Sequence, residues 1–239
     1  MLQALIFDVD GTLADTESAH REAFNQAFAQ DGLDWVWDEA LYTELLHISG
    51  GKERIRHYWN STRAGLVDVA GDGVTDTIAR LHESKTAAYE DRVKQGQVHL
   101  RPGVLALIES AHRAGLALAI ATTTSPVNIG ALLRKAIGPQ WRALFGVVED
   151  ASTAPIKKPH PQVYQQTLKR MGMEAARCIA LEDSGNGLKA ALATGLPTLI
   201  TPNRFTQHHD FAGAMRVLPD LAGTTVADLR IWHALATAS

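Results

Sequence analysis

The architecture of this chain is first indicated by LIFDVDGTLADTE, residues 5–17, an apolar strand followed by a polar turn. The strand ends with Asp8 and Asp10, which are separated only by Val9. Alternate side chains of a strand share a face, so the two carboxylates would repel each other unless the backbone turns or a cation intervenes. Gly11 can supply the turn. We therefore ask whether later segments of the chain complete a cation site.

The composition indicates a globular protein, and its charge pattern favours a small-molecule partner. With 239 residues, 46% of them hydrophobic, the chain can bury one domain-sized core or a core with a smaller insertion. The formal charge is only -3, and acidic and basic residues are mixed along the chain. This pattern argues against a broad basic face for nucleic acid and against a polybasic membrane patch.

Other features indicate where the protein resides. Cys178 is the only cysteine, so neither an internal disulfide nor a thiolate metal cluster is expected, which suits a reducing cytoplasm. The first residues lack the pattern of a signal peptide, and no stretch is long and apolar enough to span a bilayer. We therefore expect a cytoplasmic protein without a membrane partner, and we expect a monomer.

The pattern of apolar residues divides the chain into two parts. Helices are expected at residues 17–32, 39–46, 52–61 and 77–93, without a convincing strand among them. The Gly/Asp-rich stretch AGLVDVAGDGVTDT, residues 64–77, is expected to be a loop between helices.

From residue 101 onward, short apolar runs alternate with helical segments. Strands are expected within residues 116–124, 144–150, 178–184 and 197–201, and helices within residues 101–115, 126–136, 161–171, 185–195 and 226–235. This alternation predicts an α/β fold with a doubly wound, Rossmann-like parallel sheet. The core would comprise residues 1–15 and 96–239, and residues 16–95 would form an inserted helical cap.

Polar residues follow several of these strands, where ligands bind in such sheets. They are Asp8, Asp10 and Thr12 in DVDGT, Thr122 in ATTTS, Lys157 and Lys158 in KKP, and Glu182 and Asp183 in LEDS. Each motif alone has a simpler explanation: a lone D-x-D is more often a turn or a helix cap, the two lysines could be a solvated pair, and the threonines could merely end a strand. If the strands are neighbours, these groups converge in one crevice.

In this order and spacing, the four motifs resemble those of the haloacid dehalogenase superfamily of phosphatases and phosphotransferases. The resemblance implies a Mg²⁺ site formed by the side chains of Asp8 and Asp183 and the backbone carbonyl of Asp10. Glu182 would be a further metal-shell residue or a charge at a helix N-terminus. Asp8 would attack phosphorus and form an aspartyl-phosphate, while Asp10 would act first as general acid and then as general base.

The same resemblance assigns residues to the phosphoryl group. Thr122 and Lys158 would hold its equatorial oxygens, where charge spreads in the transition state. Lys158 is preferred over Lys157 because the lysine of the family immediately precedes the proline. The residues after Thr122, namely Thr123, Thr124 and Ser125, would line the substrate site.

The helical insertion is expected to select the substrate, because a lid over the crevice contacts the part of the substrate that does not react. A loop-to-helix junction is expected at Gly50 and Gly51, followed by Lys52, Glu53 and Arg54. Backbone amides at a helix start, beside a lysine and an arginine, can bind a second anionic group such as a distal phosphate. The alternative is an ordinary connection between helices.

Two further segments of the insertion carry polar residues that we expect to bind substrate. Glu17 and His20 lie on the first turn of the helix that follows the first strand, and Lys85 lies in LHESKT together with His82. With these segments, and with LRPGV, KKPHPQVY and ALEDSGNGLKAA, the chain resembles the CbbY family of sugar bisphosphate phosphatases, which is associated with the Calvin cycle. The resemblance covers nearly the full length, and GGKER is its most specific part.

The resemblance to this family implies hydrolysis of the 1-phosphate of xylulose-1,5-bisphosphate to give xylulose 5-phosphate. Glu17 would hold sugar hydroxyls, and residues 50–54 would hold the far phosphate. The alternatives are a β-phosphoglucomutase-like mutase, a sugar phosphate phosphatase of broader specificity, or a catalytically silent binding protein. One departure is that His160 and Gln162 replace a small residue and an acid, so the pKa or orientation of Lys158 could differ, although we expect activity to survive.

Overall fold

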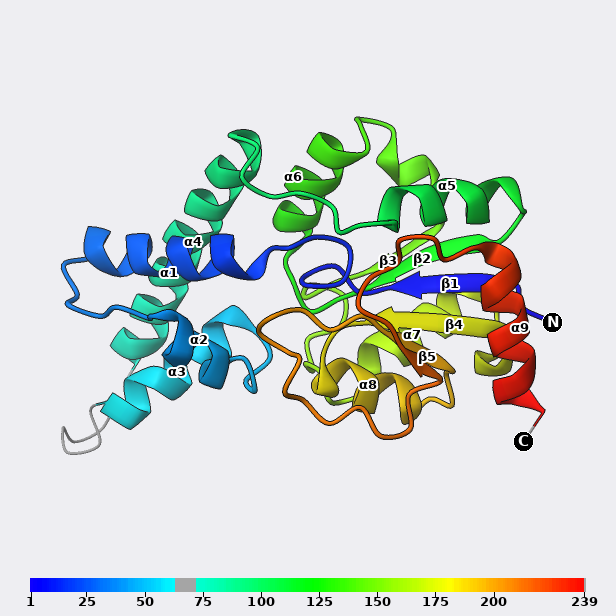
Figure 1. Cartoon of the computed structure of the whole chain (residues 1–239). Helices are drawn as coiled ribbons and strands as arrows, with labels where there is room; N and C mark the ends of the chain where they lie inside the picture. Colours follow the sequence, from blue (N-terminus) through cyan, green and yellow to red (C-terminus); the bar gives the residue numbers. More distant parts are fainter. Residues whose placement is uncertain (63–71, 239) are drawn as a thin grey trace.

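The computed structural model describes residues 1–62 and 72–238 and contains a parallel sheet flanked by helices, with a group of four further helices on one side (Figure 1). The strands are β1 (Ala4–Phe7), β2 (Ala117–Ala121), β3 (Val147–Glu149), β4 (Cys178–Glu182), β5 (Thr198–Ile200) and β6 (Arg216–Val217). Their order in the sheet is β3-β2-β1-β4-β5-β6, and every pair is parallel. The predicted fold class is therefore confirmed.

The register places β1 in the middle of the sheet, with its carboxyl end level with its neighbours. Phe7 is paired with Ile120 of β2 on one side and with Leu181 of β4 on the other. The chain first builds the half of the sheet on the β2 side and then returns to β4, so the strand order reverses next to β1. Such a switch point is where open α/β sheets bind ligands.

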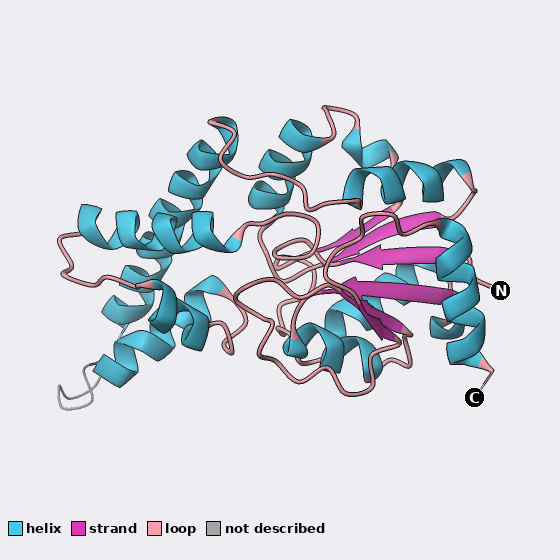
Figure 2. Cartoon of the chain, viewed as in Figure 1, coloured by secondary structure: helices cyan, strands magenta, loops and turns pink. Residues whose placement is uncertain are grey.

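Helices cover both faces of the sheet (Figure 2). They are α5 (Val104–Arg113), α6 (Pro126–Ala136), α7 (Gln162–Met171), α8 (Gly185–Leu192) and α9 (Val226–Thr237). Leu5 and Phe7 of β1 pack in one apolar cluster with residues of α5, α6 and α9, whereas Ala4 and Ile6 pack in another with residues of α7 and α8. Because successive side chains of a strand point to opposite faces, a strand buried on both faces is apolar throughout.

The four remaining helices are α1 (Glu17–Gln30), α2 (Glu39–Leu45), α3 (Gly51–Thr62) and α4 (Asp72–Lys94). We call them the cap. They share an aromatic cluster in which Trp37 and Tyr42 are fully buried, and Phe205, which follows β5, also packs in this cluster. A residue of the sheet domain thus lies in the core of the cap. The boundaries of the two parts, 16–95 for the cap and 1–15 with 96–239 for the core, stay a prediction.

The chain leaves for the cap and returns from it at adjacent points. Ala14 forms one β-bridge with Asp10 and another with Leu100, and the backbone N–H of Arg101 donates to the carbonyl of Leu13. The two passages between sheet and cap therefore lie side by side.

The structure differs from the sequence-based prediction mainly at element ends. Helix α4 begins at Asp72, so residues 72–76 are helical and not part of the expected loop over residues 64–77, whereas residues 63–71 lie outside the described part of the chain. Strand β6 was not predicted, because its two residues are exposed at the sheet edge and lack an apolar run. Within the described residues, no helix combines the length and the apolar character needed to cross a membrane.

Candidate active site

A cavity of about 390 Å³ lies beyond the carboxyl ends of β1, β2 and β4, between the sheet and the cap. All site residues that the sequence nominated line this cavity: Asp8, Asp10, Glu17, His20, Gly50, Gly51, Lys52, Glu53, Arg54, Lys85, Thr122, Thr123, Thr124, Ser125, Lys158, Glu182 and Asp183. The structure therefore brings together residues that are far apart in the sequence, from Asp8 to Asp183. Their individual roles stay predictions.

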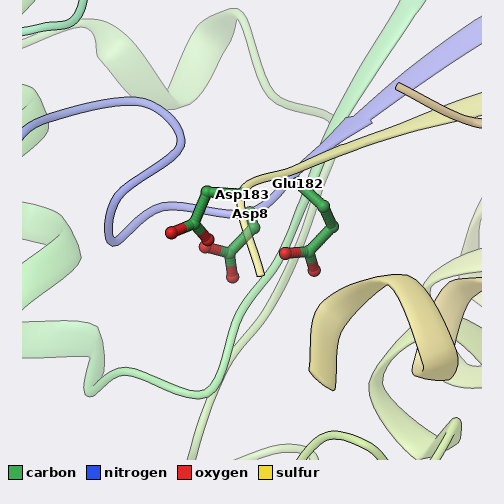
Figure 3. A group of neighbouring side chains, drawn as sticks. All are labelled: Asp8, Glu182 and Asp183. Carbon is green, nitrogen blue, oxygen red and sulfur yellow. The ribbon is translucent and has the colours of Figure 1, made fainter. Parts of the chain in front are cut away.

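Three buried carboxyl groups lie close together in the lining of this cavity. One oxygen each of Asp8, Glu182 and Asp183 lies within 4.8 Å of the others, and Figure 3 shows the three side chains at the ends of β1 and β4. The register explains this proximity, because the pairing of Phe7 with Leu181 places the residues that follow them next to each other.

Lys158 lies among these acids. Its Nζ donates to Asp8 Oδ1 at 2.6 Å, to Glu182 Oε1 at 2.5 Å and to the carbonyl of Ala121 at 2.9 Å. Burial lowers the pKa of Lys158, but the charges of Asp8 and Glu182 outweigh it and raise the pKa above its ordinary value. Lys157, in contrast, is half-buried, and the charges that act on it are those of Glu53, Asp150 and Lys52. The buried ammonium is therefore that of Lys158.

One ammonium does not balance three carboxylates. Burial, only partly offset by Lys158, raises the pKa of Asp8 to about 7, and burial together with Asp8 and Glu182 raises the pKa of Asp183 well above its ordinary value. In addition, Glu182 Oε2 is buried without a hydrogen-bond partner among the described residues. Carboxylate oxygens with excess negative charge are suitable ligands for a divalent cation such as Mg²⁺. The residues present therefore fit the metal that the sequence predicts.

Asp10 faces the cap, where a chain of buried polar groups begins. His20 Nε2 lies 2.9 Å from Asp10 Oδ1, and Lys85 Nζ lies 2.9 Å from His20 Nδ1. An ammonium can only donate, so Nδ1 accepts and the imidazole donates its Nε2–H to Asp10. Burial and the charge of Lys85 lower the pKa of His20, which keeps the ring neutral. The contact of His20 with Asp10 and that of Lys85 with His20 were not anticipated from the sequence, which assigned both residues to substrate binding.

The comparisons with known proteins agree with this geometry. A model of the haloacid dehalogenase-like hydrolases matches residues 2–195. The plasmid-encoded protein CbbY of Cupriavidus necator is 50% identical in an alignment that covers 97% of each chain.

The chain belongs to the haloacid dehalogenase-like hydrolases.

Solved structures place this hydrolase with the CbbY proteins. The crystal structure of CbbY from Rhodobacter sphaeroides in complex with phosphate has a TM-score of 0.88 and 42% identity, covering 96% of this chain and 100% of that chain. A mutant of the same CbbY in complex with xylulose-(1,5)bisphosphate has a TM-score of 0.87 and 43% identity, covering 96% and 99%. The predicted family and the predicted enzyme class, a phosphatase, are confirmed.

In this hydrolase the cap contributes a second chain of polar groups. Tyr42 donates its hydroxyl hydrogen to Glu17 Oε2 at 2.8 Å and accepts from Arg54 at 3.2 Å. Arg54 also donates to the carbonyls of Leu45 at 3.1 Å and Ile48 at 3.1 Å. Each nitrogen of this guanidinium therefore donates a hydrogen bond within the cap, and Glu17 is held in place by the hydroxyl of Tyr42.

The expected loop-to-helix junction is present at the start of α3. Gly50 has a φ of +98°, and a Cβ there would lie 2.1 Å from Glu53 Oε2, so the Glu53 side chain folds back over the loop. On the core side, Ser125 caps α6 by accepting from the backbone N–H of Asn128 at 3.3 Å. Two helix starts, from α3 and α6, thus border the cavity.

The unusual residues near Lys158 stabilise a turn. Gln162 Oε1 accepts from the backbone N–H of Ile156 at 2.7 Å, and His160 Nδ1 accepts from that of Gln162 at 3.2 Å. An amide oxygen at position 162 can accept this bond as a carboxylate would. The partners of the Lys158 ammonium are other groups, so this departure from the family pattern leaves its contacts intact.

Sequence reasoning missed two residues that contact Asp183. Asn203 Nδ2 donates to Asp183 Oδ2 at 2.8 Å, and Thr206 Oγ1 lies 3.4 Å from the same oxygen. Both follow β5, the neighbour of β4. The position of Asn203 and Thr206 after a predicted strand was the available signal. Because they belong to no recognised motif, the sequence did not identify them as site residues.

Proposed function

We propose that this hydrolase is a Mg²⁺-dependent sugar bisphosphate phosphatase that converts xylulose-1,5-bisphosphate to xylulose 5-phosphate and inorganic phosphate. The observation that supports it most is the position of Lys158 between Asp8 and Glu182, with Asp183 beside them in the lining of one cavity. The substrate follows from the relative at 43% identity that was crystallised with this bisphosphate.

The acidic cluster would hold the metal ion. The side chains of Asp8 and Asp183 and the backbone carbonyl of Asp10 would bind it, with Glu182 near them. When bound, Mg²⁺ would neutralise excess negative charge and so permit an anionic carboxylate to approach a phosphate.

Asp8 would be the nucleophile. One of its carboxylate oxygens forms a bond to phosphorus while the bond between phosphorus and the sugar oxygen breaks, which leaves an aspartyl-phosphate. Lys158 favours the ionised form of Asp8 and, with Thr122, would hold the phosphoryl oxygens as charge develops on them. Water then attacks phosphorus and releases inorganic phosphate and free Asp8.

Asp10 would move the protons. Burial raises the pKa of Asp10, but His20 and Lys85 outweigh it, so the pKa lies below its ordinary value in the free enzyme. A phosphate dianion in the cavity would raise this pKa, because like charges disfavour ionisation, and would prepare Asp10 to protonate the leaving sugar oxygen. In the second step, the ionised Asp10 would take a proton from the attacking water.

The cap would recognise the rest of the substrate. Glu17, positioned by Tyr42, would bind sugar hydroxyls, and the amides at Gly50 and Gly51 with Lys52 would bind the far phosphate. Because Arg54 is engaged with groups of the cap, the exposed Lys52 is the better source of free positive charge. Arg54 would then shape the loop that presents these groups.

A substrate panel tests this function. Phosphate release from xylulose-1,5-bisphosphate should exceed that from sugar monophosphates and should stop when EDTA replaces Mg²⁺. Equal rates on all sugar phosphates would favour the broader phosphatase. Conversion of β-glucose 1-phosphate to glucose 6-phosphate without phosphate release would instead support a mutase, whose fold is represented by the β-phosphoglucomutase of Clostridium difficile with a TM-score of 0.79 at 20% identity.

A further inference from the structure

The segment from Asn203 to Thr206 lies between the acidic cluster and the cap and contacts both. It follows β5, and two of its residues are directed to Asp183 while the two between them are directed to the cap. No motif of the sequence analysis includes this segment, and the proposed catalytic steps do not use it.

On the side of the acidic cluster, the amide of Asn203 is fixed in direction. Its Oδ1 accepts from the backbone N–H of Phe205 at 2.8 Å, which leaves Nδ2 to donate to Asp183 Oδ2 at 2.8 Å. Thr206 Oγ1 accepts from the backbone N–H of Asn203 at 3.0 Å and approaches the same carboxyl oxygen. The carboxyl group of Asp183 is thus held by donors whose own positions are determined by hydrogen bonds.

This arrangement is closely packed. A Cβ added to Gly11 would lie 2.4 Å from Asp183 Oδ2 and 2.6 Å from Asn203 Nδ2, so the turn after β1 presses against the pair. Asp183 is only 4% exposed. Water cannot readily replace Asn203 as a partner of this buried carboxyl group. A small displacement of Asn203 therefore reorients Asp183 or breaks the hydrogen bond between them.

On the side of the cap, the segment contributes an aromatic anchor. Phe205 is 3% exposed, packs in the aromatic cluster of the cap, and meets Tyr42 edge to face at 5.9 Å between ring centroids. Arg204 donates to Ser18 Oγ at 2.5 Å and lies 3.4 Å from Glu39 Oε2. Because these contacts join the segment to α1 and α2, a movement of the two helices would displace the segment with them.

We propose that the Asn203–Thr206 segment couples the position of the cap to the orientation of Asp183. Asn203 is the positioning residue for the carboxylate, and Phe205 is the residue that senses the cap. Since Tyr42 contacts both Phe205 and Glu17, a sugar bound at Glu17 acts on the same anchor. This inference rests on the proposed metal site, of which Asp183 is a member.

A loop that only closes its own turn does not account for these contacts. An Asn side chain that bonds to the backbone two residues ahead completes a local turn with its oxygen alone. Here the amide nitrogen is used as well, for a carboxyl group 20 residues away in the chain. Groups that orient a metal ligand in this way commonly raise the affinity of the metal by 10–100-fold.

Direct metal binding tests the coupling without a catalytic readout. The dissociation constant of Mn²⁺, followed by the electron paramagnetic resonance of the free ion, is measured for the full chain and its variants in the absence of sugar. We expect Asn203→Ala to raise the dissociation constant about 10–100-fold. Phe205→Ala removes none of the groups that contact Asp183, and we expect it to raise the dissociation constant about five-fold or more.

Phe28→Ala is the matched control for Phe205→Ala. Phe28 is fully buried in the same aromatic cluster but packs against Trp35 and Trp37 within the cap. Phe28→Ala should leave the dissociation constant of Mn²⁺ within about two-fold of that of the parent protein. A general loosening of the aromatic cluster is not expected to change the orientation of Asp183. Circular dichroism verifies folding, and if an alanine variant is unfolded, Phe205→Leu and Phe28→Leu are compared instead.

The outcomes separate this inference from the proposed function. If the parent protein binds Mn²⁺ and Asn203→Ala binds it equally well, or if the variants at positions 205 and 28 behave alike, the coupling is refuted while the metal site stands. If the parent protein itself does not bind Mn²⁺, the proposed metal site is refuted and the coupling with it.

Discussion

Lys158 Nζ lies 2.6 Å from Asp8 Oδ1, although 150 positions of sequence separate the two residues. Both groups are buried, and the same ammonium contacts Glu182 at 2.5 Å. This contact connects the turn after β1 with the loop before α7, and the acidic end of β4 lies against both. The behaviour of the site therefore depends on how one positive charge is shared among several negative ones.

Removing this positive charge should destabilise the protein as well as inactivate it. Lys158→Met leaves Asp8 and Glu182 buried without their cation, which costs about 3–5 kcal/mol when one partner of a buried pair is lost. Urea denaturation in EDTA measures the change. Lys52→Met removes an exposed lysine from the same cavity and should change stability by less than about 0.5 kcal/mol. Similar losses for both variants would contradict the importance we give to the buried pair.

Asp8→Asn should separate chemistry from folding. The amide keeps an oxygen that can accept from Lys158 and removes one of the crowded negative charges, so the variant should fold as well as the parent protein. Without the nucleophilic carboxylate, kcat should fall by at least about 10³-fold. Asp15→Asn, with a side chain 68% exposed, is the control and should retain activity. Turnover by Asp8→Asn at the parental rate would show that another residue attacks phosphorus.

Tyr42→Phe should affect substrate binding more than turnover. The change removes the hydroxyl group that donates to Glu17 and accepts from Arg54, and a lost hydrogen bond of this kind is worth about 1 kcal/mol. We expect KM for the bisphosphate to rise about five-fold with kcat nearly unchanged, because the proposed role of Glu17 is to bind sugar hydroxyls and not the reacting phosphate. Tyr58→Phe, in the same aromatic cluster, should have wild-type kinetics. A fall in kcat alone would argue against a binding role for Glu17.

His82 should make the cap sensitive to acid. Burial, followed by the charges of Lys85 and Lys52, lowers the pKa of His82 to about 3. Between this value and about 6.5, the unfolded chain binds a proton that the folded protein does not bind, so stability falls as the pH falls through this range.

Urea denaturation at pH 7 and pH 5 measures the contribution of His82. Between pH 7 and pH 5 the free energy of unfolding of the parent protein should fall. In His82→Gln this fall should be smaller by about 1–2 kcal/mol. Other histidines contribute equally to parent and variant, so the difference belongs to His82. If parent and variant lose the same stability, the low pKa of His82 is refuted.

Gly11→Ala tests the tight packing beside Asp183. Gly11 and Gly32 have similar backbone angles, with φ of +77° and +73°, but a Cβ at Gly32 would meet nothing within 4 Å. Gly32→Ala should therefore cost only the backbone strain of about 1–2 kcal/mol. Gly11→Ala should cost clearly more and should also lower activity, as thermal unfolding and a phosphate-release assay would show. Equal costs at the two positions would mean that the contact with Asp183 is easily relaxed.

The sequence was most informative where function and strand ends coincide. Asp8, Thr122, Lys158 and Asp183 could be assigned because each follows or precedes a recognisable element, and parallel strands bring their carboxyl ends to one edge. The sheet itself followed from apolar runs alternating with helices. Strand β6 escaped prediction because an exposed edge strand of two residues has no apolar run.

Contacts between the cap and the core were not predictable in the same way. The contacts of His20 with Asp10 and of Tyr42 with Phe205 depend on how the cap and the sheet meet. No periodicity in the sequence encodes that orientation. Arg54 was correctly placed at the cavity, but its engagement with Tyr42 and two carbonyls depends on the path of a loop that the sequence pattern does not specify.

The bridges of Ala14 to Asp10 and to Leu100 have an evolutionary consequence. A segment whose two ends are joined at one spot can be shortened, lengthened or replaced as a unit, because the hydrogen-bond ladder of the sheet never passes through it. Changes in the specificity of such an enzyme can therefore accumulate in the insertion while the reacting groups stay under separate selection.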